Sequence, residues 1–330
     1  MHVLIRLAAR GLGLGALMAI STRDVLAHGI GAPEPTPLSV LTTWSIDPLP
    51  WAGVLVAGGA YLVAVRHVNR SNPRVPVPRR RVAAWLAGLA AILIALVSAV
   101  DVYAGDLLTV HMAQHLFLAM VAPPLLALGA PITLALRVAS PRVRHRLILP
   151  VLHSGVVRVI ASPLVAWPLF ALAMWFTHFS PLYDAALEDP ALHDAEHLLY
   201  LATGLLFWWP VVAADPSPWR LGYGSRLAFV GLQMPVNAAV GLAIYFAPTV
   251  LYAHYATIER SWGPNALIDQ QIGGVVMWGA GDLLLLVGVH AVVVAWMRAD
   301  ARRSLRFDAR SSATMAAEAD GHADQPAPIG

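Results

Sequence analysis

The sequence predicts an all-α fold, an integral membrane bundle of seven transmembrane helices. Of the 330 residues, 58% are hydrophobic and 12% are charged, whereas a water-soluble domain carries about 25% charged residues. The hydrophobic residues gather in long runs, and a run of about 20 residues can cross about 30 Å of hydrocarbon. Seven such segments lie near residues 49–66, 82–101, 107–136, 162–178, 194–213, 226–247 and 268–297.

Residues 1–27 are predicted to be a secretory signal peptide. Arg6 and Arg10 precede a short apolar stretch, residues 11–20, and the small residue Ala27 supplies a cleavage position. The stretch is too short to span a membrane. Two charged residues just before the cleavage position leave an uncleaved leader as the alternative.

Three segments follow the leader. Residues 28–48 are rich in proline and are predicted to be extended and external. Residues 49–297 form the seven-span membrane domain, in which Pro123 and Pro124 are expected to bend the third span. Residues 298–330 are predicted to be an arginine-rich cytoplasmic tail, partly disordered because its end is rich in Ala, Asp and Ser.

The placement of arginine predicts the orientation, because cytoplasmic loops of membrane proteins carry an excess of positive charge. Eighteen arginines lie after the first, third and fifth spans and in the tail: Arg66, Arg70, Arg74, Arg79, Arg80, Arg81, Arg137, Arg142, Arg144, Arg146, Arg158, Arg220, Arg226, Arg298, Arg302, Arg303, Arg306 and Arg310. The loops on the other side hold only Arg260. We therefore expect a multi-pass protein of a bacterial inner (cell) membrane, with its amino terminus outside and its carboxyl terminus in the cytoplasm.

This orientation gathers histidines in one layer near the outer surface. Its members are His111, His115, His178, His193, His197 and His254, with the carboxyl groups of Asp101, Glu196 and Asp269. Four of them form two pairs spaced i,i+4, which places both rings of a pair on one helix face. Ionisable side chains inside spans are costly and indicate function. His111, His115, His193 and His197 are therefore predicted metal ligands, joined by His178, whereas a lone His254 is more typical of an interfacial residue.

Copper is the metal that the donor set predicts. The chain has no cysteine, and imidazole suits copper, zinc and iron, of which divalent copper binds most tightly. Met112 and Met174 lie in the same layer. Thioether sulfur suits Cu(I), so Met112 joins the predicted ligands, although methionine in an apolar bundle commonly serves packing. Bis-histidine haem is disfavoured, because two haems at one depth would crowd. Cleavage after Ala27 would make His28 a terminal Cu(II) chelate. Binding should weaken below pH about 6.5, where imidazole becomes protonated.

Four segments carry a family resemblance: "HMAQHLFLAMVAPPLLALGAP", "WFTHFSPLYDAAL", "HDAEHLLYLATGLLFWWP" and "DQQIGGVVMWGAGD". They resemble the CtaG family of cytochrome c oxidase assembly factors, the multi-span type associated with the caa3-type oxidase, over roughly residues 40 to 297. The resemblance implies a role in oxidase maturation, supplying copper at the outer side of the membrane. It implies that the two histidine pairs handle the metal, with Glu196 as a ligand or supporting group, and that His178 falls in a third matching segment.

The implied partners are a cytochrome c oxidase subunit or a copper chaperone, besides membrane lipid. Nucleic-acid motifs, a phosphate loop and a nucleophile triad are absent from the sequence, so an enzyme is the least expected class. Two alternatives stay open. One is a copper transport or tolerance protein, for which Asp282 and His290 offer the polar groups beyond the cluster. The other is a metal-free scaffold for oxidase subunits, in which the histidines form hydrogen bonds between helices.

Overall fold

The computed structural model describes residues 32–323, with side chains through Phe307. The expected leader, residues 1–27, and His28 lie outside this range. Within it the fold is helical, and extended pairing is limited to one isolated bridge between Trp44 and Ser98. The all-α prediction is confirmed for the part of the chain that the structure describes.

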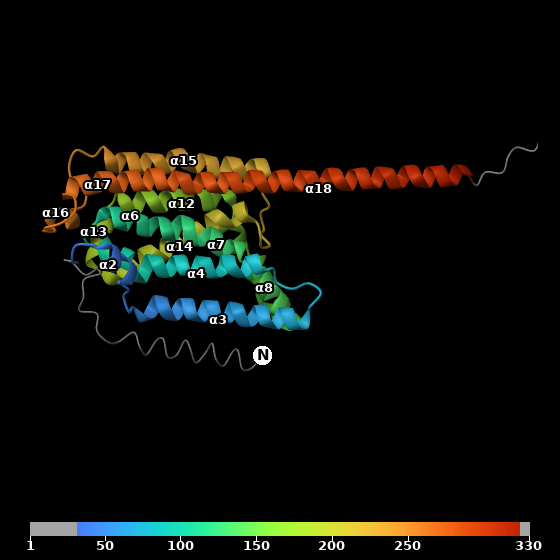
Figure 1. The fold of residues 1–330 in the computed structure, drawn as a ribbon, viewed down its shortest axis with the longest axis horizontal. Helices are drawn as coiled ribbons and strands as arrows, with labels where there is room; N and C mark the ends of the chain where they lie inside the picture. Colours follow the sequence, from blue (N-terminus) through green and yellow to red (C-terminus); the bar gives the residue numbers. More distant parts are fainter. Residues whose placement is uncertain (1–31, 324–330) are drawn as a thin grey trace, which may run out of the picture.

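The helices run mostly side by side (Figure 1). In chain order they are α2 (Pro37–Thr42), α3 (Pro48–Ser71), α4 (Arg79–Val97), α5 (Ala99–Ala104), α6 (Leu108–Leu116), η1 (Phe117–Val121), α7 (Ala122–Leu128), α8 (Pro131–Val138), α9 (Pro141–Val143), η2 (Arg144–Ile148), α10 (Leu149–Leu152), α11 (Gly155–Ile160), α12 (Pro163–His178), α13 (Leu182–Glu188), α14 (Pro190–Val212), α15 (Tyr223–Tyr245), α16 (Ala253–Thr257), α17 (Ala266–Val275), η3 (Val276–Ala280) and α18 (Gly281–Ala323). The η elements are π-helical turns.

Each of the seven predicted segments coincides with a helix, but fewer helices qualify as membrane spans. By length and composition five helical stretches could cross a membrane: Pro48–Ser71, Arg79–Val97, Leu108–Val138, Tyr223–Tyr245 and Ala266–Phe307. A sixth results if α12 and α13, bent by 71°, count as one span. The 23-residue helix α14 is not among them. The described chain is thus an all-helical membrane protein with five or six qualifying spans, and the predicted number of seven is not confirmed.

The third span, which the sequence predicts to bend at Pro123 and Pro124, contains a π-helical turn and a break. Pro123 and Pro124 have no N–H for the carbonyls four residues earlier, and their rings crowd those carbonyls. The π-helical turn η1 stands directly before these prolines. The helix then breaks at Ala130, whose φ of 51° is left-handed, and α8 begins at Pro131.

The helix α14 occupies the centre of the bundle, where it contacts α12, α7 and η1. Its approach to the third span is unusually close at Gly204. A Cβ at this position would lie 2.6 Å from the carbonyl oxygen of Ala119 and 2.8 Å from Cγ of Pro123. Only glycine permits this distance. The close approach brings the histidines of α6 and the histidine-bearing start of α14 together.

The carboxyl-terminal helix α18 extends well beyond the other helices (Figure 1). It continues through Ala323, into the tail that the sequence predicts to be partly disordered. Its last turns are rich in Ala and Arg, which favour helix even without packing.

Candidate metal centre

Five histidine rings from three helices form one contiguous cluster. The ring centroids of His111 and His115 on α6 lie 4.3 Å apart, and those of His193 and His197 on α14 lie 3.9 Å apart. Across the helices, His111 lies 5.5 Å from His193, and His115 lies 5.4 Å from His178 at the end of α12. All five residues are buried. The structure therefore brings together the five histidines that the sequence singles out.

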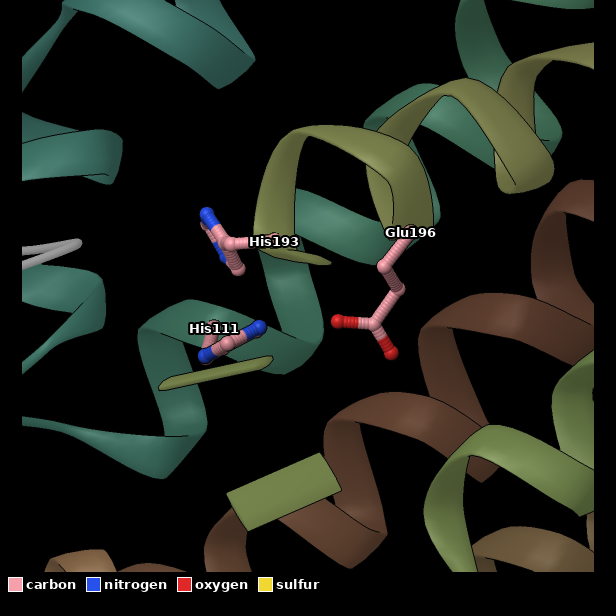
Figure 2. Close-up of side chains that lie close together, drawn as sticks. All are labelled: His111, His193 and Glu196. Atoms are coloured by element: carbon pink, nitrogen blue, oxygen red, sulfur yellow. The ribbon is translucent and has the colours of Figure 1, made fainter. Parts of the chain in front are cut away.

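Three members of the cluster are positioned to share a metal ion. His111, His193 and Glu196 each offer one ligand atom, and these atoms lie within 4.8 Å of one another. Figure 2 shows the three side chains converging from α6 and α14, with the carboxylate of Glu196 directed toward the two rings. The grouping crosses between helices instead of following one i,i+4 pair. Small adjustments of the side chains would allow each of the three ligand atoms to lie about 2.0–2.2 Å from one shared metal ion.

The orientation of His111 is fixed by a hydrogen bond to Tyr255. Nδ1 of His111 lies 2.8 Å from the hydroxyl of Tyr255, which donates its own proton to the carbonyl oxygen of Ala104 at 2.7 Å. Because that proton is already used, we infer that Nδ1 of His111 is the donor and that Nε2 carries the lone pair. Metal-binding histidines commonly donate their second nitrogen in this way.

His178 is held in the same manner. Its Nδ1 donates to the carbonyl oxygen of Met174 at 2.7 Å, so Nε2 carries the lone pair. Within the described part of the chain this Nε2 is buried and has no hydrogen-bond partner. A buried polar atom without a partner is costly, which is the condition that a bound ion relieves.

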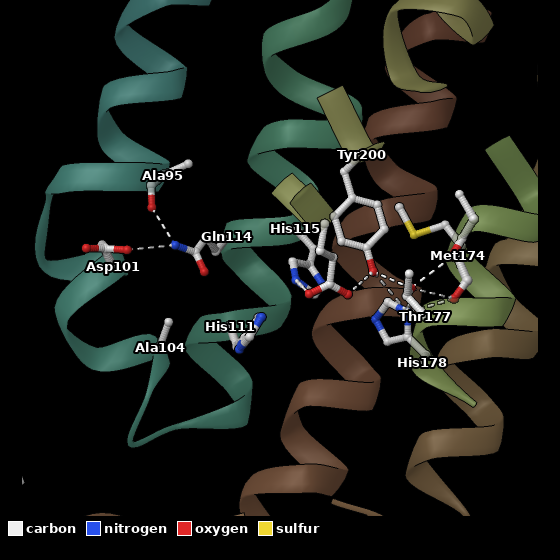
Figure 3. Close-up of polar contacts among 12 residues, drawn as sticks. Ala95, Asp101, Ala104, His111, Gln114, His115, Met174, Thr177, His178 and Tyr200 are labelled. Atoms are coloured by element: carbon white, nitrogen blue, oxygen red, sulfur yellow. Dashed lines mark hydrogen bonds and ion pairs between the residues drawn. The ribbon is translucent and has the colours of Figure 1, made fainter. Parts of the chain in front are cut away.

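Glu196 contacts both a tyrosine and a histidine of this region. One carboxylate oxygen accepts a hydrogen bond of 3.1 Å from Tyr200, and the other lies 4.0 Å from Nε2 of His115. Tyr200 also contacts Thr177 and His178 (Figure 3). Glu196 is thereby fixed with one oxygen free to move toward an ion.

Four buried tyrosines that the sequence pattern does not single out surround the cluster: Tyr183, Tyr200, Tyr252 and Tyr255. The ring of Tyr200 lies 4.4 Å from that of His115, and the ring of Tyr183 lies 5.3 Å from that of His111. Burial raises the pKa of Tyr252 and of Tyr255 above the ordinary phenol value, so both remain neutral. The spacing of Tyr200, three residues after His197 on the same helix, was the available signal.

Asp269, one of the carboxyl groups that the sequence groups with the histidines, serves a structural role. Its carboxylate accepts hydrogen bonds from the backbone N–H groups of Leu108 at 2.7 Å and Thr109 at 3.3 Å. The residue before α6, Leu107, offers no side-chain cap. Asp269 therefore caps α6 from the neighbouring helix α17, satisfying donors that a helix start leaves open.

Asp101 and His254 lie beside the cluster instead of inside it. Asp101 accepts a hydrogen bond of 3.1 Å from Gln114, whose amide also donates to Ala95 (Figure 3). Burial of the carboxyl group raises the pKa of Asp101 to about 7. Nε2 of His254 lies 3.0 Å from the carbonyl oxygen of Gly105, which agrees with the structural role expected of it.

Met112, which is among the predicted metal ligands, and Met174 are both buried. Met112 is fully buried in the hydrophobic core, with its Cγ beside Gly273 of α17. This contact is one of packing. Met174 is buried one turn deeper than His178 on α12 and contributes the carbonyl oxygen that orients that ring.

The polar groups of the transport alternative lie in different environments. Asp282 accepts a hydrogen bond of 3.1 Å from Asn237, which also donates to the carbonyl oxygen of Met277. His290 lies on the exposed surface of α18. The pair is therefore not joined with the histidine cluster by any contact that the structure describes.

Comparison with known proteins identifies relatives of unassigned role. An uncharacterized protein of Mycobacterium tuberculosis (strain CDC 1551 / Oshkosh) is 32% identical over 288 residues, 85% of this chain and 43% of the relative. An uncharacterized protein of Mycobacterium leprae (strain TN) is 31% identical over 298 residues, 87% of this chain and 45% of the relative. The chain thus spans less than half the length of these curated relatives. No solved structure matches it. The family model of the cytochrome c oxidase caa3 assembly factor matches residues 59–299, a range that includes the whole histidine cluster, and the chain belongs to this Caa3_CtaG family.

Proposed function

We propose that this protein assists the maturation of a cytochrome c oxidase by holding copper and passing it on at the outer face of a bacterial inner membrane. The role is non-catalytic, and copper is the cargo. One observation carries the proposal: His111, His193 and Glu196 place three ligand atoms within 4.8 Å in a buried site. The expected partners are an oxidase subunit that receives the ion and a copper chaperone that supplies it.

The chemistry of the three ligands suits this cargo. Imidazole nitrogen binds copper well, and neither cysteine nor a disulfide is needed. Burying a cation costs free energy unless an opposite charge accompanies it. The carboxylate of Glu196 supplies that charge, and Tyr200 and Tyr255 hold Glu196 and His111 in place. The site can therefore accept an ion without large rearrangement.

The remaining histidines give the ion a second level of ligands. His115 and His197 follow His111 and His193 by four residues, which places them about 6 Å further along their helices. His178, with its available Nε2, faces His115. A series of donors one turn apart allows an ion to exchange ligands stepwise without ever losing all of them. Such exchange suits a protein that must release its cargo as well as bind it.

We further propose seven spans with the amino terminus outside. In this arrangement α14 is the remaining span: it is 23 residues long and lies at the centre of the bundle against α12 and α7. The ionisable residues of its first turns would face the cluster and not lipid. The arginine bias supports a position of the cluster near the outer surface, where an oxidase subunit could receive copper.

The function is tested in cells that lack this protein. The oxidase is purified from cells complemented with the wild type, with His111→Ala/His193→Ala, or with the control His67→Ala/His153→Ala, whose two histidines are exposed away from the cluster. We expect the cluster variant to yield oxidase depleted of copper and the control to yield normal oxidase. Normal copper content with the cluster variant would contradict copper delivery and favour the metal-free scaffold.

A further inference from the structure

A cavity of about 410 Å³ lies at the arginine-rich end of the bundle, remote from the histidine cluster. It opens among the end of α3, the helix α8 and the chain that links α8 to α12. The lining residues are Asn72, Thr133, Leu136, Arg137, Arg144, Leu149 and Pro216. Asn72 directly follows α3, one of the qualifying spans. The cavity therefore lies at the level where a span ends and lipid head groups begin.

The charge of this cavity is positive. Arg137 donates to the carbonyl oxygen of Val75, and Arg144 donates to that of Ala139 at 3.3 Å. A guanidinium has five N–H donors. Each of these hydrogen bonds therefore uses only some of the donors of its arginine. Nε of Arg144 is buried and has no acceptor within the described part of the chain.

A carboxylate beside the cavity is already engaged. Asp215, next to the lining residue Pro216, accepts hydrogen bonds from the backbone N–H groups of Ile132 at 3.0 Å and Thr133 at 2.6 Å. These donors begin α8, whose dipole also offsets the charge of Asp215. The two guanidiniums are therefore left to attract an anion.

The chain beside the cavity exposes apolar side chains. Leu147 and Val151 are each 61% exposed, and Val156 and Val159 follow along the same linking segment with similar exposure. Arginines interrupt this apolar surface, as in helices that lie in the membrane interface. Anion-binding donors next to lipid-facing apolar side chains match the two parts of a phospholipid.

We propose that this cavity binds the head group of an anionic phospholipid, with Arg137 and Arg144 on the phosphate oxygens and an acyl chain along Leu147 and Val151. Basic pockets at the ends of membrane helices recognise anionic head groups, and guanidinium fits phosphate with paired hydrogen bonds. Inorganic phosphate shares the head-group chemistry but has no acyl chain. The exposed apolar side chains favour the lipid as the occupant. This proposal does not depend on the copper function.

Native mass spectrometry of the full chain, delipidated in a neutral detergent, tests the proposal. Phosphatidylglycerol is titrated against the wild type, Arg144→Gln and the control Arg146→Gln, whose exposed arginine lies on the same segment outside the cavity lining. We expect one tightly bound phosphatidylglycerol, with affinity about tenfold weaker in Arg144→Gln and changed less than about twofold in Arg146→Gln. Circular dichroism and size-exclusion profiles establish that both variants fold.

Three results would overturn the proposal. Phosphatidylcholine binding as tightly as phosphatidylglycerol would show that the anionic head group is not recognised. Equal losses in the two variants would indicate general attraction to a basic surface instead of a site. Competition by inorganic phosphate at the same concentration as the lipid would assign the cavity to a soluble anion.

Discussion

Gly204 offers a way to disturb the histidine cluster without altering any ligand. Replacing Gly204 with alanine adds a Cβ only 2.6 Å from the carbonyl oxygen of Ala119. To change that distance to an ordinary contact of about 3.4 Å, α14 must retreat from the third span by about 0.8 Å. Metal ligands tolerate deviations of about 0.2 Å. Because His193 and His111 lie on the two helices that separate, we expect copper affinity to fall at least about tenfold.

The matched control is Gly231→Ala on α15, where an added Cβ would meet nothing within 4 Å. Alanine is the better helix former by about 1 kcal/mol, so the control should be as stable as the wild type or more stable. Crowding at Gly204 should instead lower the free energy of unfolding by about 1–3 kcal/mol. Thermal denaturation and copper competition with a chelator of known affinity measure both effects. Equal copper affinity in the two variants would refute the claim that the spacing of α14 and the third span sets the site.

Two further predictions concern the groups around the cluster. Tyr255→Phe removes the acceptor for Nδ1 of His111, and we expect copper affinity to fall about 10- to 100-fold. The control Tyr252→Phe should bind copper almost as the wild type does. Unchanged copper affinity in Tyr255→Phe would show that His111 needs no such support. The pKa of Asp101, raised by burial to about 7, means that the folded state binds more protons than the unfolded state between pH about 4 and 7. Stability should therefore fall as the pH rises through this window, and denaturation of Asp101→Asn should lose this pH dependence; an identical slope in the variant would contradict it.

The sequence was sufficient to predict the helices and most of the cluster. Hydrophobic runs mark the spans within a few residues, because a membrane helix must be apolar along its whole length. The i,i+4 spacing of His111 with His115 and of His193 with His197 fixes the two faces. That the faces meet depends on close packing at Gly204, which no local pattern reveals.

Other features depend on contacts between distant segments. Asp269 resembles a cluster carboxylate in the sequence, but it caps α6 from α17. Tyr255 supports His111 from the short helix α16 before the last span, 144 residues away in the chain. Met112 and His111 are adjacent in the sequence, yet a helix directs successive side chains about 100° apart, so Met112 faces the packing contact at Gly273. The depth of a residue can be read from its sequence position, whereas its neighbours cannot.

Copper bound per protein molecule tests the central claim most directly. The full chain and His111→Ala/His193→Ala are purified in detergent, loaded with copper, desalted and measured by mass spectrometry, with His67→Ala/His153→Ala as the control. We expect stoichiometric copper in the wild type and the control, and its loss in a cluster variant that retains its helical circular dichroism. Copper retained by the folded cluster variant, or bound by none of the three proteins, would contradict the assignment of this site.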